Sequence, residues 1–456
     1  MRQKYHFIKT IQVLFQVLVT LLFFGTITNT QQPKKQWTFF VYIAAVNDLR
    51  SFAAMNIKQM AQIGSNEHIN IVVHLDILLS GNKKITRRYY VEQGKVVHMN
   101  ADDPDTQQMD SGDPQTVISS FKWMIELYPS DYIAWIGWNH GTGPIDPGIR
   151  QVVNTTDLFV FNPTTHTLEL DRNISFLDYI SATAQAYMHQ RGVCWDDITG
   201  NYLTNQKLEY AFKTICSECL DGKKIDIVGF DACLMMGIEI ADIFAPYTHY
   251  LIGSQEVELG LGWRYDYVLE PFQHQSLTPR EFSKHIVESY KRAYRDMTND
   301  YTQSAVDLSK FDELKEMMHC IASILSECLT LQKDQTVKKA IKASRSKKIT
   351  TVFDEPTYID LYHWFTNLQA GVKYFNLVNP YKEKELKLEL IYALEEAKKI
   401  LDEHIIANEV GKNLSKARGL SLYFPEKNIH PSYKKTSFWR TTDWGTFLTT
   451  YLDSNI

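Results

Sequence analysis

Apolar and polar positions along the chain follow two periods in turn, which predicts strands separated by helices. Continuous apolar runs, typical of buried strands, occur at "WTFFVYIAAV" from Trp37, "INIVVHLD" from Ile69, "DYIAWIGW" from Asp131 and "KIDIVGF" from Lys224. Segments with helical spacing, such as "PQTVISSFKWMIELY" and "LTNQKLEYAFKTI", lie between them. This order predicts an α/β fold in which a largely parallel sheet carries helices on its faces.

Shorter elements complete this order. "RRYYVEQGKVVHMN" predicts a hairpin with Gln93 and Gly94 at its turn, and "HYLIGSQ" and "YTQSAVDLS" predict two later strands. One helix is expected to begin near Leu234, another opens at "TPREF" with its proline in the first turn, and a long one ends near Leu331.

Two stretches depart from the alternating pattern. Residues 141–200 have weak periodicity and several turn signals, which is typical of an insertion. The lysine-rich "QKDQTVKKAIKASRSKK" is expected to be a solvated connection. We therefore predict a main domain at 36–331 and a smaller α+β unit at 332–456. The second unit holds the helix "PTYIDLYHWFTNLQ", a long helix over about 382–407, the strand "GLSLYFP" and a terminal helix around Trp444.

The first 30 residues have the pattern of an export signal peptide. A basic start precedes an apolar run from Ile11 to Ile27, and small residues follow before Gln31. An uncleaved membrane anchor is the alternative, because the run approaches the roughly 18 residues that cross a bilayer, although Gln12 and Gln16 weaken it. The sequence predicts a secreted or exported protein, which meets a membrane only if this leader is retained.

Composition narrows the class of protein. A chain of 456 residues with 44% hydrophobic residues can bury a large core, and its net charge of −5 argues against nucleic acid as a partner. Six cysteines in a chain of this size do not form a disulfide framework. Cys216 and Cys219 form a CxxC, but no second pair or histidine cluster completes a zinc site.

Two predicted strands end in polar tips that carry reactive side chains. "DYIAWIGWNHG" contains His140, and "KIDIVGFDAC" ends at Cys233. The carboxyl ends of parallel strands share one edge of a sheet, where ligands bind in open α/β folds, so these residues can be neighbours. A thiol at the start of the helix expected near Leu234 would be favoured as a thiolate, and an imidazole beside it can act as a base. Taken singly, a cysteine or histidine at a strand end is more often structural.

An ordered set of motifs favours a catalytic over a structural interpretation of His140 and Cys233. The motifs are "NHG", "GVCWDDITGNYLTNQKL", "DACLM", "GSQEVELGLGW", "IDLYHW", "GLSLYFP" and "TDWGTFL". From about Trp37 to Leu452, this set resembles the clostripain family of cysteine peptidases. The resemblance implies a caspase-like α/β/α sandwich, related to caspases, legumains and gingipains, and a His-Cys dyad that cleaves peptide bonds after basic residues.

The resemblance also implies roles for single residues. It makes Cys233 the nucleophile and His140 the base, with the backbone N–H groups of Gly141 and Cys233 as oxyanion donors. Asp231 matches the acidic position that pairs with a substrate Arg or Lys, a contact strengthened in a partly desolvated pocket. A carboxylate that caps the following helix is the structural alternative for Asp231.

The segment after "HYLIGSQ" carries the rest of the implied substrate site. Ser254 and Gln255 are implied as substrate-binding residues. Relatives often hold a second acidic residue in the glycine-rich loop before the tryptophan, whereas "GLGW" here contains Leu261. Glu256 and Glu258 are the nearby residues that can replace it.

Neither a cofactor nor a metal is required by this chemistry. Some relatives need calcium, and the adjacent Asp196 and Asp197 suggest a calcium site. These two carboxylates lack the spaced ligands and the turn glycine of an EF-hand loop. Cys194 lies in the insertion without a histidine-tipped strand beside it and is predicted to be structural.

The sequence thus predicts an exported cysteine endopeptidase that acts on proteins or peptides with basic residues. An inactive peptidase scaffold used for binding or adhesion is the alternative, and the intact His140, Asp231 and Cys233 argue against it. Self-processing is also predicted, because the insertion begins directly after His140 and flexible loops are favoured sites of cleavage. Arg150 is the expected cut site, with Arg172 and Arg191 as second choices.

Overall fold

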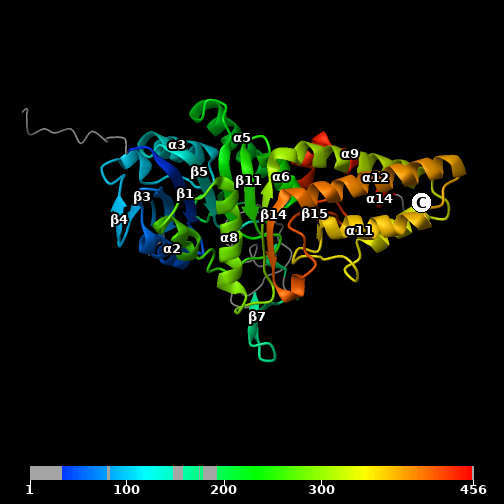
Figure 1. Cartoon of the computed structure of the whole chain (residues 1–456), viewed down its shortest axis with the longest axis horizontal. Helices are drawn as coiled ribbons and strands as arrows, with labels where there is room; N and C mark the ends of the chain where they lie inside the picture. Colours follow the sequence, from blue (N-terminus) through cyan, green and yellow to red (C-terminus); the bar gives the residue numbers. More distant parts are fainter. Residues whose placement is uncertain (1–32, 80–82, 147–157, 174, 178–192, 454–456) are drawn as a thin grey trace, which may run out of the picture.

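A nine-stranded mixed sheet forms the centre of the molecule (Figure 1). The computed structural model describes residues 33–79, 83–146, 158–173, 175–177 and 193–453. The strands lie in the order β14-β12-β11-β10-β5-β1-β2-β3-β4. Their bounds are β1 (Lys35–Ala45), β2 (Ile69–Leu78), β3 (Lys84–Glu92), β4 (Lys95–His98), β5 (Ser130–Trp138), β10 (Ile225–Asp231), β11 (Thr248–Gly253), β12 (Thr302–Asp307) and β14 (Ile405–Val410). Strands β11, β10, β5, β1 and β2 run parallel, and the strands outside them pair antiparallel.

The continuous apolar runs arise because the parallel strands are buried on both faces. In β1, Phe40 and Tyr42 pack into one hydrophobic core, while Phe39, Val41 and Ile43 pack into the other. A strand covered on both sides needs apolar residues at every position, as predicted from the sequence. The α/β class and the largely parallel sheet are therefore confirmed.

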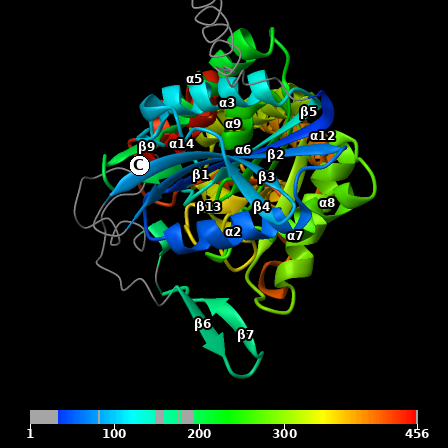
Figure 2. The ribbon, with the colours of Figure 1, turned by 90° about the vertical axis from the view of Figure 1, so that its left-hand side faces the viewer.

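Helices cover the two faces of the sheet (Figure 2). One layer contains α3 (Pro114–Leu127), α5 (Asn205–Thr214) and α6 (Ile238–Phe244), and the other contains α2 (Arg50–Ile63), α7 (Tyr265–Leu269) and α8 (Pro279–Tyr294). Side-chain caps fix the starts of α5 and α8: Thr204 caps α5, and Thr278 forms a capping box at α8 with proline in the first turn.

The C-terminal part extends beyond β14 as a group of helices (Figure 1). It contains α9 (Phe311–Leu331), α10 (Thr336–Ser344), α11 (Leu361–Gly371), α12 (Pro380–His404), α13 (Ser437–Thr441) and α14 (Trp444–Asp453), with the strand pair β13 (Tyr358–Asp360) and β15 (Ser421–Tyr423). Its buried aromatics, among them Trp364 and Trp444, belong to the same hydrophobic core as one face of the sheet. Strand β14 of this part is also the edge strand of the main sheet.

Three local expectations are wrong. The lysine-rich segment forms α10 rather than a solvated connection, because Val337, Ala340 and Ile341 recur on one buried face. The helix predicted to run to about residue 407 ends at His404, and the chain continues as β14. The helix expected near Leu234 begins at Ile238, after Gly237.

The insertion contains two short strand pairs. They are β6 (Phe159–Asn162) with β7 (Thr167–Leu170), which project from the body (Figure 2), and β8 (Val193–Asp196), which pairs with β9 (Asn201–Leu203) directly after the insertion. The predicted signal peptide, Arg150 and Arg191 lie outside the described residues. Of the helices within the described ranges, none is both long and apolar enough to cross a membrane.

Candidate active site

Strands β5 and β10 are neighbours, and their register brings the two polar tips together. Trp138 pairs with Asp231, so His140 and Cys233 each follow two residues beyond a paired position. Both residues line one cleft of about 460 Å³ at the carboxyl edge of the sheet. The prediction that these two residues are neighbours in space is therefore confirmed.

Cys233 lies in a turn between β10 and α6. Its side chain is buried, and its Sγ accepts a hydrogen bond of 3.2 Å from the backbone N–H of Glu258. Leu234, the next residue, has φ of +61°, a strained conformation for a residue with a side chain. Burial, together with the negative charge of Glu258, raises the pKa of the Cys233 thiol well above its usual value. The expected stabilisation by a helix start at Leu234 is absent, because α6 begins at Ile238.

His140 is held by a carboxylate that the sequence did not single out. Its Nε2 lies 2.8 Å from Oδ1 of Asp48, which follows β1 and lines the same cleft. The imidazole also packs near the ring of Phe176, with 6.1 Å between centroids. The available sequence signal was a polar pair, Asn47 and Asp48, directly after an apolar strand at the same sheet edge.

Gly141 allows the two tips to touch. A Cβ atom at this position would lie 2.4 Å from the carbonyl oxygen of Cys233, so only glycine fits without a shift of the backbone. Within the described part of the chain, the backbone N–H groups of Gly141 and Cys233 donate to no protein acceptor. Their role as oxyanion donors stays a prediction.

Asp231 and Glu258 form a pair of buried carboxyl groups in the cleft. Asp231 accepts hydrogen bonds from the Trp263 backbone N–H (3.0 Å) and the Tyr265 hydroxyl (2.8 Å). Gly262, with φ of +64°, lets the loop pass close to the Asp231 carboxylate, because a Cβ there would lie 2.8 Å from Oδ1. Burial raises the pKa of Asp231 to about 6. Burial and the charge of Asp231 raise the pKa of Glu258 well above its usual value.

This carboxyl pair has no cation of its own among the described side chains. The helix-capping alternative for Asp231 also fails, because α6 begins seven residues later and has no side-chain cap. Glu256 and Glu258 were expected to replace the acidic residue that relatives often hold at the position of Leu261. These two side chains lie in different surroundings. Glu258 faces the cleft, whereas Glu256 binds Arg172 at 2.7 Å.

Comparison with protein-family models matches residues 41–152 and 178–451 to the clostripain family, Peptidase C11. The chain belongs to the clostripain family. Its predicted enzyme class, cysteine peptidase, is therefore confirmed at the level of the family. A search of the curated proteins finds no significant match.

Solved clostripain-family structures share the fold. One is a secreted C11 cysteine protease from Bacteroides thetaiotaomicron in complex with an irreversible peptide inhibitor, with a TM-score of 0.56 and 17% identity; the match covers 91% of this chain and 99% of that one. Another is an inactive zymogen C11 protease from Parabacteroides distasonis, with a TM-score of 0.55 and 16% identity, covering 90% and 99% of the two chains. These likenesses confirm the predicted architecture of this clostripain-family chain.

Ser254 and Gln255 do not line the cleft of this clostripain-family chain. The Ser254 hydroxyl bonds with the Thr302 hydroxyl at 2.9 Å, and the Gln255 amide binds Asp360 Oδ2 at 3.0 Å and the Gly419 N–H at 2.9 Å. Both residues are fully buried. Their side chains join the end of β11 to β12 and the C-terminal part, so the structure places these side chains in the interior.

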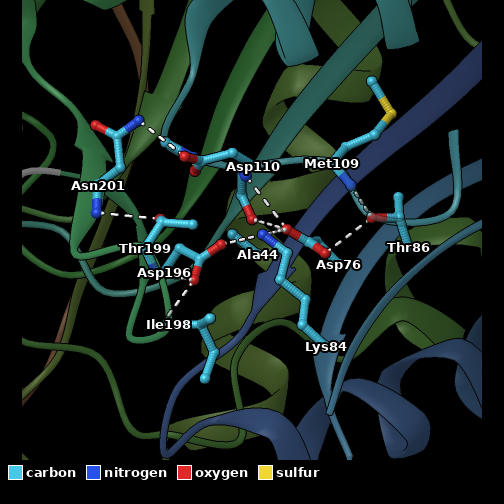
Figure 3. A network of polar contacts seen from close by, with 12 residues as sticks. Ala44, Asp76, Lys84, Thr86, Met109, Asp110, Asp196, Ile198, Thr199 and Asn201 are labelled. Carbon is cyan, nitrogen blue, oxygen red and sulfur yellow. Dashed lines mark hydrogen bonds and ion pairs between the residues drawn. The ribbon is translucent and has the colours of Figure 1, made fainter. Parts of the chain in front are cut away.

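The carboxylates considered for calcium are engaged by protein groups. Asp196 is buried and pairs with Lys84, which also lies 2.9 Å from Asp76 (Figure 3). Asp197 accepts from the indole N–H of Trp195. In the described ranges, no group of three or more His, Cys, Asp or Glu side chains has the arrangement of a metal site.

The other insertion residues named above or lining the cleft have three kinds of surroundings. Cys194 is fully buried, and burial raises the pKa of its thiol far above the usual value, as suits a structural cysteine. Arg172, a second choice for self-cleavage, binds Glu256 and Asp300. Leu158, Phe159 and Phe176 line the cleft, so the insertion forms part of its wall.

Proposed function

We propose that this clostripain-family peptidase is an exported endopeptidase that cleaves after Arg and Lys through Cys233 and His140. The carboxyl pair of Asp231 and Glu258 beside Cys233 is the observation that carries this specificity. A carboxyl pair buried without a cation is unfavourable, and a guanidinium or ammonium group from the substrate would neutralise it. Hydrogen bonds to charged groups in such a pocket are stronger than those on an open surface.

In the proposed reaction, His140 takes the proton from the Cys233 thiol and Sγ attacks the scissile carbonyl carbon. The N–H groups of Gly141 and Cys233 would hold the oxyanion, which is consistent with their lack of protein acceptors in the described chain. His140 then gives its proton to the leaving amine as the C–N bond breaks. A water molecule, deprotonated by His140, hydrolyses the thioester and restores the thiol.

The raised pKa of Cys233 supports this order of events. A buried thiol with a raised pKa is weakly reactive by itself, so it needs a base within the same cleft. His140 is the imidazole that lines this cleft.

The test uses three matched peptides with Arg, Lys or Met before the scissile bond. Wild type should cleave the Arg and Lys peptides, and Cys233→Ala and His140→Ala should each abolish cleavage. The two losses should not add, because paired residues act as one unit. Substantial turnover by Cys233→Ala, or equal rates on the Met peptide, would overturn the proposal.

Self-processing within the insertion belongs to the same proposal, with Arg150 as the cut site. The insertion supports it by contributing Leu158, Phe159 and Phe176 to the wall of the cleft. The guanidinium of Arg172 is held by two carboxylates, which makes Arg172 a poorer substrate. Intact-mass analysis of wild type beside Cys233→Ala should show two fragments only for wild type. Identical cleavage of both proteins would assign the cut to another protease.

A further inference from the structure

The loop after β1 places a carboxylate against the histidine of the cleft. Oδ1 of Asp48 lies 2.8 Å from Nε2 of His140, and the imidazole itself is only 6% exposed. Asp48 is 36% exposed at the rim, where its carboxylate meets water. A buried ring with one nitrogen held by a carboxylate has a fixed tautomer, in which Nε2 carries the proton and Nδ1 is left as the base.

Asp48 is held in place by its neighbour in the chain. The Asn47 amide donates to the carbonyl oxygens of Ala44 and Trp195, both at 3.1 Å, and its Oδ1 accepts from the Leu49 N–H at 3.0 Å. These bonds fix the backbone on both sides of Asp48. The loop therefore presents its carboxylate from a rigid support.

The same anchor holds the tip that carries His140. The Asn139 amide donates to the Ala44 carbonyl oxygen, and its Oδ1 accepts from the Trp195 N–H at 3.1 Å. Ala44 and Trp195 thus bind both loops, one through Asn47 and the other through Asn139. Two asparagines bonded to the backbone of the same two residues set the distance between Asp48 and His140.

Helix capping does not account for this carboxylate. The N-cap of α2 is Leu49, without a side-chain hydrogen bond, and the first turn of α2 has no acidic residue. Among the described residues, the other titratable groups that line the cleft are Asp231, Cys233 and Glu258, from the β10 tip and the loop after β11. Of the described groups, Asp48 is the one that hydrogen-bonds with the imidazole.

We propose that Asp48 is a positioning residue that fixes the tautomer of His140 and stabilises its protonated form during peptide cleavage. The proposal rests on the proposed roles of His140 and Cys233. It adds a charged third group, so the proton taken from Cys233 is held by an imidazole paired with a carboxylate. The pairing is strongest while the ring is protonated, which is when the reaction needs it.

The experiment compares Asp48→Asn, Asp48→Glu and wild type on the peptide with Arg before the scissile bond, across pH 5–9. Asp48→Asn should lower kcat/KM roughly ten- to a hundredfold near pH 7.5, with most of the loss in kcat. The acidic limb of its pH profile of kcat/KM should move to lower pH, because the protonated ring loses its partner charge. Asp48→Glu keeps the charge and should keep the wild-type acidic limb while recovering part of the rate.

Asp131→Asn is the matched control, since Asp131 is an exposed residue at the opposite end of β5 whose carboxylate pairs with Lys34 on the surface. It should match wild type. Thermal unfolding, and the fraction of protein alkylated by a basic peptidyl electrophile, report whether each variant is folded. The role of Asp48 would be overturned if the acidic limb of the pH profile of Asp48→Asn coincided with that of wild type. Activity of Asp48→Asn within twofold of wild type would overturn it as well. A wild type that neither cleaves nor becomes alkylated would instead overturn the proposed function.

Discussion

Two buried pairs of carboxyl groups near the carboxyl edge of the sheet differ in one respect, the presence of a cation. Asp76 and Asp196 share the ammonium group of Lys84, which is 10% exposed (Figure 3). Asp231 and Glu258 share no cation of the described chain, and they line the cleft beside Cys233. Burial raises the pKa of Asp76 and the pKa of Asp231, each to about 6. One aspartate of each pair therefore has a similarly raised pKa.

We call the site of Asp76 and Asp196 complete, because Lys84 supplies its cation. We call the site of Asp231 and Glu258 open, because no described side chain supplies one. Where the chain supplies the cation, the carboxylates join segments of the fold: Lys84 comes from β3 and Asp196 from the insertion. Arg172 does the same for Glu256 and Asp300. Where the described chain supplies none, the pair faces a cleft that a substrate side chain can enter. The predictions below test this contrast.

Removing the cation from the complete site should have the largest effect on stability. Lys84→Met leaves Asp76 and Asp196 buried without a partner, which should lower the free energy of unfolding by about 3–5 kcal/mol at pH 8. The loss should shrink at pH 5, because Asp76 is then protonated. Urea unfolding at both pH values measures it. Lys95→Met, at an exposed surface pair with Glu92, is the control. A loss below about 1 kcal/mol at pH 8 would contradict the cation's role.

Removing a charge from the open site should affect activity instead. Asp231→Asn should lower kcat/KM for Arg and Lys peptides roughly ten- to a hundredfold, since one charge-assisted hydrogen bond in a buried pocket contributes about 1.5–3 kcal/mol. Cleavage of a neutral peptide should change little. Steady-state kinetics on the matched peptides decide the matter. An equal loss with neutral peptides would show that Asp231 shapes the cleft rather than pairing with the substrate.

These two sites also show what the sequence could and could not predict. The tips at His140 and Cys233 were predictable, because each follows a continuous apolar run and parallel strands end at one edge. Glu256 and Glu258 could not be told apart, since they lie in an irregular segment where no periodicity says which side chain faces the cleft. Asp48 was missed because its function depends on contact with a residue 92 positions later.

Some helix boundaries could likewise be predicted from the sequence, and others could not. Caps with a specific side chain, such as Thr204 and Thr278, were readable from the sequence. The start of α6 at Ile238 was not, because Gly237 lies inside an apolar run and its extended backbone ends the strained turn at Leu234. Tertiary packing, not local propensity, decides this boundary.

Removing Arg172, the cation that the insertion supplies, should have an intermediate effect on stability. Arg172 is 41% exposed, but it binds two buried carboxylates, so Arg172→Met should lower the free energy of unfolding by about 1–2 kcal/mol. Because Glu256 and Asp300 lie outside the cleft lining, kcat/KM for a neutral peptide should stay within a few-fold of wild type. Urea unfolding and kinetics on one preparation test both statements. Loss of activity without loss of stability would place Arg172 in the reaction.

The smallest expected effect is the pH dependence of the open site. Burial raises the pKa of Asp231 to about 6 in the folded protein, against about 3.9 in an unfolded chain. Between these values the folded state binds more protons at Asp231, so the contribution of Asp231 to the free energy of unfolding falls as pH rises from about 4 to about 6 and is constant above that. The Asp231→Asn variant has no titrating carboxyl group at this position, so it lacks this pH dependence. Its stability relative to wild type should therefore increase by about 1–2 kcal/mol across this interval, the shared titration with Glu258 reducing the full linkage value. Chemical unfolding at half-unit steps from pH 4 to 8 gives the curve, with Asp131→Asn as the exposed control. A relative stability that is flat in pH, or that falls as pH rises, would mean that Asp231 already has a cation in the folded protein, and the contrast with Asp76 and Asp196 would not hold.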